Sequence, residues 1–184
     1  MYINNMKSKS GFSLIELLIF VSVIAVFFVV GAAVSIASLR SMILNEHKIL
    51  ATHYSEELLE WLNTQKEIDW NLFAEKAAAI SGASNTCANV SSCSAVTYCF
   101  NTSPINITSL SGWPAPEAGL NPCPQTSLNP GIYSRELTLS VVNCSPGVSI
   151  CQSSQINVTI NTGWTEIGTA YSAPINTVFS VWEQ

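Results

Sequence analysis

The first half of the chain is dominated by one long apolar run. No residue from Leu17 to Leu39 is charged, and about 20 apolar residues are enough for a helix that crosses a bilayer. Glu16 lies at the start of this run. A carboxylate at membrane depth costs about 2.5 kcal/mol or more and is a functional hypothesis by default. We expect its partner to be an amine, and a cut after Gly11 would create one on Phe12.

An amphipathic pattern continues the predicted helix beyond the apolar run. Apolar residues recur near one stripe, at Ile43, Leu50, Tyr54, Leu58, Trp61 and Leu62. We predict one helix over residues 12–63 that spans a membrane in its first half, about residues 12–39. The alternative is a bend near Ser35, Ser38 and Ser41, followed by a separate amphipathic helix.

The polar residues of this helix do not predict a metal site. His47 and His53 are six residues apart and therefore lie on different faces of a helix, which favours surface or packing roles. Glu56, Glu57 and Glu60 are interpreted as a solvated face rather than a cation site. No metal ligand set and no cofactor is predicted.

Residues 64–83 are predicted to form a short helix and a linker. Asp69 or Asn71 could cap this helix at its N-terminus. We expect it to run to about Ile80 and to end by Gly82.

From Ser84 onward the composition changes to Ser, Thr, Asn, Cys, Pro and Gly, and residues 84–184 predict a β-rich head domain. Strand-like runs occur at 95–101, 133–142, 155–161 and 177–182. Alternation with period two is clearest at 137–141 and 156–160, which predicts an antiparallel hairpin. Residues 162–168 are interpreted as a turn or short returning strand. Residues 103–131 are predicted to be a long loop in which Trp113 is packed. The expected fold class is α+β, a long helix on a small antiparallel sheet with disulfide-tied loops.

All six cysteines lie in the C-terminal part of the chain: Cys87, Cys93, Cys99, Cys123, Cys144 and Cys151. An even number of cysteines beyond a membrane segment suggests disulfides in an oxidising compartment. A metal site is the weaker interpretation because no Cys-x-x-Cys pair occurs. Cys144 and Cys151 flank a Ser-Pro-Gly turn between two strand-like runs and are the favoured pair. The remaining pairs would be Cys99 with Cys123 and Cys87 with Cys93.

The charged residues indicate which classes of binding partner to expect and how the chain is oriented in the membrane. The net charge of −5 argues against non-specific attraction to nucleic acid, although a local basic patch around Arg135 or Lys76 is left open. Lys7 and Lys9 precede the apolar run and favour a cytoplasmic N-terminus. The sequence has no paired catalytic constellation, no Gly-x-Ser-x-Gly and no His-Glu-x-x-His, so we do not expect an enzyme.

Two ordinary interpretations of the N-terminus fit poorly. A secretory signal peptide has an apolar core of about 7–15 residues, and this run is longer, even though Ala33-Val34-Ser35 could pass as a weak cleavage site. A plain membrane anchor accounts for the length of the run but leaves Glu16 unexplained.

The stretch Gly11-Phe12-Ser13-Leu14-Ile15-Glu16, followed by an apolar run, resembles the N-terminus of type IV pilins and pseudopilins. The resemblance implies that a prepilin peptidase removes residues 1–11 and methylates the new amine of Phe12. It also implies that Glu16 neutralises the amine of an adjacent subunit in a filament. Leaving either of these buried charges unpaired is heavily penalised, so the pair would set the axial register of the subunits.

The same resemblance implies partners and a location. The partners would be other pilin or pseudopilin subunits, the prepilin peptidase and the assembly platform of the inner membrane. The chain would cross that membrane once, with its C-terminal domain in the periplasm, before it enters the filament. Patterns at Glu56–Trp61, Asp69-Trp70 and Val158–Trp164 are similar to minor pilins and pseudopilins of the PilV and GspI kind.

The leading hypothesis is a structural subunit, a minor pilin or pseudopilin, of a type IV pilus or a type II secretion-like filament. The alternative is a tip adhesin or DNA-uptake pilin that binds a ligand through its Cys-bounded loops.

Overall fold

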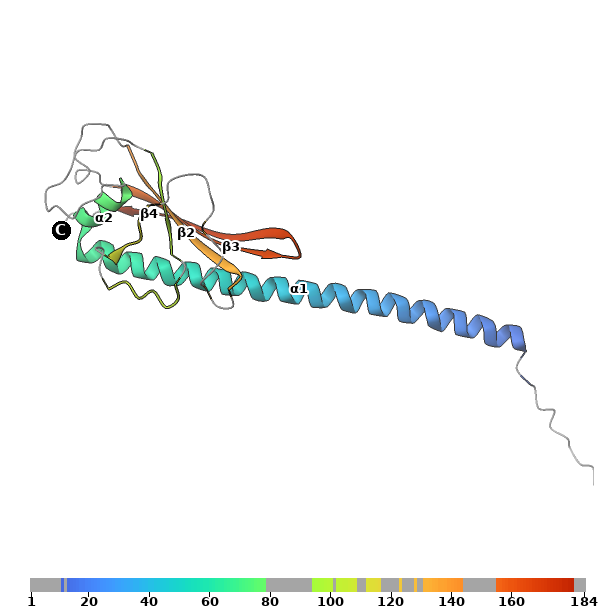
Figure 1. Cartoon of the computed structure of the whole chain (residues 1–184). Helices are drawn as coiled ribbons and strands as arrows, with labels where there is room; N and C mark the ends of the chain where they lie inside the picture. Colours follow the sequence, from blue (N-terminus) through green and yellow to red (C-terminus); the bar gives the residue numbers. More distant parts are fainter. Residues whose placement is uncertain are drawn as a thin grey trace, which may run out of the picture. The chain divides into compact units, whose positions relative to one another are not determined.

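The computed structural model describes residues 11, 13–78, 94–100, 102–108, 112–116, 123, 128, 131–143 and 155–180. It divides the chain into two compact units, Met1–Asn45 and Glu46–Gln184, and we call the second the head unit. The elements of the whole chain, most of which are labelled in Figure 1, follow in the order α1 (Leu14–Ile68), α2 (Trp70–Ala77), β1 (Val96–Cys99), β2 (Tyr133–Val141), β3 (Gln155–Glu166) and β4 (Thr169–Ser180).

The helix α1 is continuous from Leu14 to Ile68. The prediction of one helix is therefore confirmed, although the helix ends at Ile68, five residues after the predicted end at 63. The alternative of a break near Ser35, Ser38 and Ser41 is wrong. The hydroxyl of Ser35 donates a hydrogen bond to the carbonyl of Gly31 at 2.9 Å. A serine that bonds back to the preceding turn in this way stays within the helix.

The short helix α2 is capped by Asp69. The backbone N–H of Leu72 donates to Asp69 Oδ1 at 3.0 Å, which satisfies one of the donors that the first helical turn leaves open. Asp69, rather than Asn71, is therefore the cap. The helix ends at Ala77, with Ala78 as its C-cap, about three residues before the predicted end near Ile80. Residues 79–83 lie outside the described residues.

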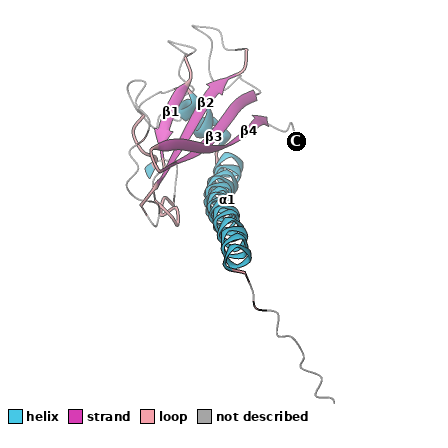
Figure 2. Cartoon of the chain, turned by 90° about the vertical axis from the view of Figure 1, so that its right-hand side faces the viewer, coloured by secondary structure: helices cyan, strands magenta, loops and turns pink. Residues whose placement is uncertain are grey.

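The four strands form one antiparallel sheet in the order β1-β2-β3-β4, drawn in magenta in Figure 2. The predicted hairpin is confirmed, since Leu137 pairs with Ile160 and Val141 with Ile156. The prediction of a turn or short returning strand at residues 162–168 is wrong for 162–166, and only Ile167 and Gly168 form a turn. Strand β3 continues to Glu166, and β4 begins at Thr169, eight residues before the predicted start of the last strand.

Cross-strand pairing explains this correction. Thr162-Gly163 looked like a turn, but Gly163 lies opposite Ser134 on one side and Ser172 on the other. Beyond it, Trp164 pairs with Tyr133 and Tyr171. Aromatic and β-branched neighbours favour a strand strongly enough to outweigh one internal glycine.

Buried and more exposed residues alternate along the strands, and the buried face of the sheet packs against α1 and α2. The larger apolar cluster joins Leu58 and Leu62 of α1 and Phe73 of α2 to buried residues of the sheet and the following loop: Val96, Tyr98, Phe100, Trp113, Leu137, Leu139, Ile156, Val158, Ile160 and Phe179. Trp113 is buried against Trp61, Phe73, Tyr98 and Phe100, which confirms the prediction that it packs. A smaller cluster contains Ala51, Leu128, Tyr133, Trp164 and Ala173.

One disulfide lies among the described residues. Cys99 at the end of β1 is bonded to Cys123 across 24 residues, with the two Cα atoms 5.5 Å apart. The pairing of Cys99 with Cys123 is thereby confirmed. Cys87, Cys93, Cys144 and Cys151 lie outside the described residues, so their pairings stay predictions.

Candidate assembly site and polar seam

Glu16 lies in the first turn of α1, and its side chain is exposed. The turn is closed by hydrogen bonds from the backbone N–H groups of Glu16 and Leu17 to the carbonyl of Ser13, at 3.0 and 3.2 Å. A carboxylate in the first turn also interacts favourably with the helix dipole. Gly11 is exposed, and Phe12 lies outside the described residues. Within the part of the chain that the structure describes, no side-chain partner is recorded for Glu16.

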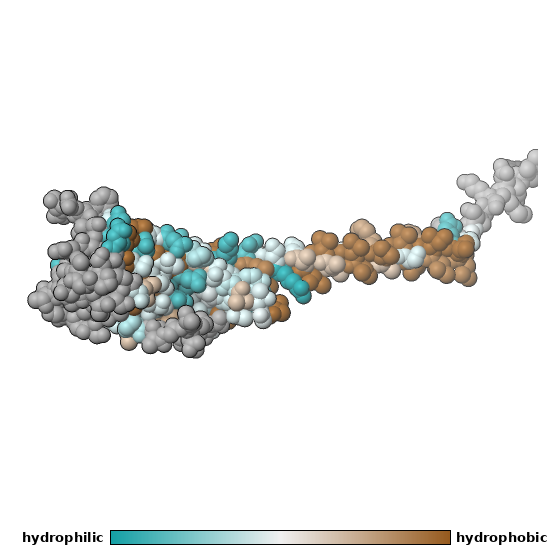
Figure 3. All heavy atoms as spheres, turned by 90° about the horizontal axis from the view of Figure 1, so that it is seen from above, coloured by the Kyte–Doolittle hydropathy of each residue, from teal (hydrophilic) through white to brown (hydrophobic). Residues whose placement is uncertain are grey.

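The helix that follows Glu16 exposes apolar side chains all around its axis. Leu14, Phe27 and Met42 have exposed fractions of 82, 76 and 70%. The most apolar 18-residue window of α1 has a mean hydropathy of 3.0, and none of it is buried. By length and composition this helix could cross a membrane, and Figure 3 shows the apolar segment in brown. A helix that is apolar on every side needs either lipid or other helices around it.

The head unit contains a buried ion pair between β2 and α1. Arg135 is fully buried, and its Nη1 donates to Glu57 Oε2 at 2.9 Å. The same guanidinium donates to three backbone carbonyls, those of Tyr54 (2.6 Å), Phe100 (2.9 Å) and Thr102 (2.7 Å). Burial lowers the pKa of Arg135 from its usual value, and Glu57 opposes this shift through its hydrogen bond and its charge. The arginine is therefore held as a paired cation in the core.

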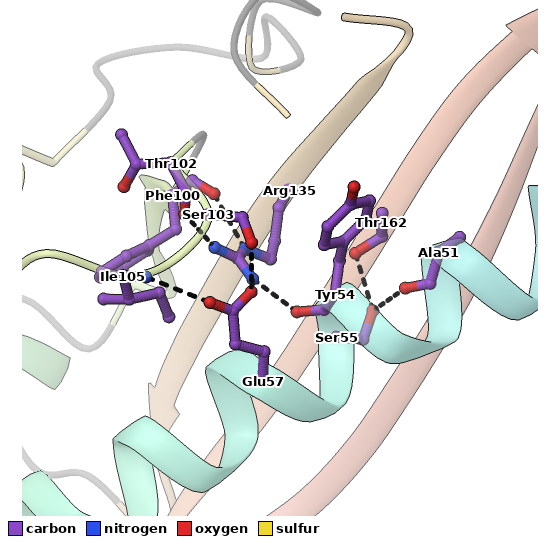
Figure 4. A network of polar contacts seen from close by, with 10 residues as sticks. All are labelled: Ala51, Tyr54, Ser55, Glu57, Phe100, Thr102, Ser103, Ile105, Arg135 and Thr162. Carbon is purple, nitrogen blue, oxygen red and sulfur yellow. Dashed lines mark hydrogen bonds and ion pairs between the residues drawn. The ribbon is translucent and has the colours of Figure 1, made fainter. Parts of the chain in front are cut away.

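Glu57 ties the loop after β1 to the helix. Its Oε2 accepts a hydrogen bond from the Ser103 hydroxyl at 3.0 Å, and its Oε1 accepts one from the Ile105 backbone N–H at 3.1 Å. Figure 4 shows both oxygens in use, with Arg135 on the sheet side. The interpretation of Glu56, Glu57 and Glu60 as one solvated face is therefore wrong for Glu57. Glu56 and Glu60 are exposed as expected.

A second polar contact lies beside this pair. Ser55 and Thr162, both fully buried, approach to 2.7 Å between their hydroxyl oxygens, and the Ser55 hydroxyl also reaches the Ala51 carbonyl at 3.1 Å. Thr162 is the cross-strand neighbour of Arg135. We call Ser55, Glu57, Arg135 and Thr162 the polar seam. Along β2 and along β3 it separates the residues of the two apolar clusters.

The smaller cluster has a polar contact of its own. Tyr133 is fully buried, and its hydroxyl lies 2.6 Å from His47 Nδ1. Burial raises the pKa of Tyr133 to about 12, with smaller contributions from Tyr54, Glu46 and Glu166. His47 is therefore a packing residue, as predicted, and it fixes α1 to the start of β2.

Comparison with protein families bears on the N-terminal site. Residues 6–32 match the model of the prokaryotic N-terminal methylation motif. The chain carries a pilin-type N-terminus. No curated protein and no solved structure matches the chain.

The methylation motif covers Gly11, Phe12 and Glu16 together with the first part of the exposed apolar helix. It is consistent with a type IV pilin-family protein and supports a pilin-like subunit that is structural rather than enzymatic. It implies, in general terms, processing by a prepilin peptidase and assembly with other pilins. The motif and the long apolar helix together fit a membrane-anchored pilin.

The position of Arg135 excludes it from a surface patch that could bind nucleic acid. Arg135, which was left open as the centre of a basic patch, is fully buried and bonded within the head unit. It cannot contact DNA from that position.

Sequence reasoning missed the polar seam, although a signal was present, since Arg135 has the same parity along β2 as the apolar Tyr133, Leu137 and Leu139. A charge at an inward-facing position requires a buried partner.

Proposed function

We propose that this chain is a minor pilin or pseudopilin, a structural subunit of a type IV pilus or a type II secretion-like filament. The observation that carries the proposal is the methylation motif at residues 6–32, followed by a helix whose apolar side chains are exposed on every side. The helix needs a lipid environment before assembly and a bundle of similar helices afterwards. A filament of pilin-like subunits supplies both.

The proposed maturation starts from a precursor that crosses the inner membrane once. Lys7 and Lys9 hold its N-terminus in the cytoplasm, and the head unit lies in the periplasm. A prepilin peptidase cuts between Gly11 and Phe12 and methylates the new amine of Phe12. The inner-membrane assembly platform then adds the subunit to the filament.

In the filament, Glu16 would pair with the methylated amine of Phe12 of an adjacent subunit. Methylation leaves that amine positively charged. At a separation of about 4 Å and an effective dielectric constant of about 20, two such charges attract by about 4 kcal/mol. The exposed position of Glu16 in the first turn of α1 makes its carboxylate available to another chain.

The direct test is the mass of the mature N-terminus. The full chain is coexpressed with a prepilin peptidase, recovered from membranes and analysed by intact-mass and peptide mass spectrometry. We expect the product to begin at Phe12 and to carry one methyl group on its amine. Gly11→Val should leave the precursor uncut, whereas the neighbouring control Ser10→Ala should be processed normally. A wild-type chain that keeps residues 1–11 would refute the proposal.

A further inference from the structure

The turn between β3 and β4 holds an isoleucine in a conformation that isoleucine rarely adopts. The last cross-strand pair is Glu166 with Thr169, so Ile167 and Gly168 form a two-residue connection. Their φ angles are +48° and +76°. Positive φ at both central residues is typical of a type I′ turn, in which Asn-Gly is strongly preferred. Gly168 fits that preference, but a β-branched residue at positive φ is a genuine outlier.

Within the described part of the fold, no burial of the Ile167 side chain compensates for this strained conformation. Ile167 is 84% exposed. Strand β2 begins at Tyr133, opposite Trp164, so the end of the β3–β4 hairpin extends beyond β2. Figure 1 shows this projection within the head unit. Backbone strain at a position without compensating contacts points to a function outside the chain.

The hairpin behind Ile167 is well supported. The rings of Trp164 and Tyr171 are stacked, with centroids 5.6 Å apart and an interplanar angle of 19°. Trp164 also packs against Tyr133, whose hydroxyl is bonded to His47 of α1. Ile167 is therefore presented at the end of a firmly anchored hairpin, three residues beyond the stacked pair of Trp164 and Tyr171.

We propose that Ile167 is a docking contact between subunits, and that it binds the apolar helix face of a neighbouring pilin-like subunit. This inference rests on the proposed function. The helix α1 of this chain carries such exposed apolar residues, since Met42, Ile43 and Ile49 are 70, 44 and 70% exposed. An isoleucine at a hairpin tip can insert between side chains of this kind and gain the burial that it lacks in the single chain.

The charge around the tip favours a protein partner over a lipid surface. Residues 165–170 contain Glu166 and no lysine or arginine, and Glu166 and Glu46 both act on Tyr133 as negative charges. Binding to an anionic membrane surface depends on basic residues, and these carboxylates would oppose it. An apolar helix face carries no such penalty.

The first arm of the test separates stability from assembly. Ile167→Asn supplies the residue that a type I′ turn prefers, so the detergent-solubilised full chain should gain about 3–6 °C in Tm. The same substitution should lower incorporation into filaments about tenfold, as expected for the loss of one buried isoleucine. The control Val178→Thr removes an exposed apolar residue (53%) elsewhere on β4 and should leave incorporation unchanged.

The second arm identifies what the tip contacts. A photo-reactive phenylalanine derivative placed at position 167 should crosslink to another filament subunit, at its α1 segment, in assembled filaments. Crosslinks to lipid alone would overturn the proposal, and so would wild-type incorporation by Ile167→Asn. A fall in Tm for Ile167→Asn would also overturn it, because Ile167 would then serve the fold. If the wild-type chain never enters filaments, the proposed function fails first, and this inference fails with it.

Discussion

Glu16 and Arg135 are both charged residues among apolar ones, and they differ in where their partners lie. Arg135 is paired within the chain by Glu57 and three carbonyls. For Glu16, the described residues of the chain offer no side-chain partner, and the residue stands at the head of an exposed apolar helix. A carboxylate at the start of a membrane-length apolar helix is a functional hypothesis by default, and we expect another subunit to neutralise Glu16.

Replacing Glu16 tests this expectation at the residue scale. We predict that Glu16→Ala and Glu16→Gln insert into the membrane and are cleaved after Gly11 as the wild type is. Their incorporation into filaments should fall more than about a hundredfold, because the buried amine of the neighbouring subunit loses its counter-charge. The measurement is the ratio of the variant in sheared filaments to that in membranes, by quantitative immunoblot.

Glu16→Asp is the matched control, since it keeps the charge and shortens the side chain. It should assemble better than Glu16→Gln. Equal assembly of Glu16→Gln and the wild type would show that no ion pair forms at this position.

At the scale of elements, the polar seam determines how α1 and the sheet meet. Apolar packing alone is tolerant of sliding, because Leu and Ile contacts are similar from one turn of a helix to the next. The seam is directional, since Arg135 of β2 must meet Glu57 and the Tyr54 carbonyl of α1, and Ser55 must meet Thr162 of β3. We infer that it fixes the register of the helix against the sheet, the role for which buried polar groups are best attested.

A double-mutant cycle at the seam measures this coupling. Arg135→Met leaves Glu57 partly buried without its cation, and we predict a loss of about 3–5 kcal/mol in the free energy of unfolding. Glu57→Leu should cost a similar amount, because it leaves the buried guanidinium unpaired. The double variant should lose clearly less than the sum of the two, as measured by urea unfolding of the detergent-solubilised chain. Strict additivity would mean that the pair contributes no coupling.

At the scale of the whole molecule, the two compact units differ in what they need from their surroundings. The segment up to Asn45 exposes its apolar side chains, whereas the head unit has a buried core formed by α1, α2 and the sheet. The surfaces therefore predict that only the first unit requires lipid or detergent.

A truncated chain that starts at Glu46 tests this division. We predict that residues 46–184 remain soluble and monomeric without detergent and unfold in one cooperative transition. Analytical size-exclusion chromatography and circular dichroism would show this, with the full precursor, which should need detergent, as the comparison. Aggregation of the truncated chain would show that the head unit depends on the N-terminal segment.

The sequence by itself determined the features that depend on residues close together along the chain. The membrane-length helix follows from the apolar run, and the pairing of 137–141 with 156–160 follows from their period of two. The sequence also limited the α2 cap to Asp69 or Asn71, and the structure decided for Asp69. The pilin-type N-terminus follows from the order of Gly11, Phe12 and Glu16 before that run. Each of these depends on spacing along the chain, which a sequence displays directly.

The tertiary structure alone decided the features that depend on distant partners. Glu57 and Arg135 are 78 residues apart, so nothing near Glu57 in the sequence distinguishes it from the exposed Glu56 and Glu60. Strand β3 continues through Thr162-Gly163 because β2 and β4 pair with it on both sides, which outweighs the local preference for a turn. Burial and cross-strand pairing set the free energy at these positions, and both arise only when segments far apart in sequence come together.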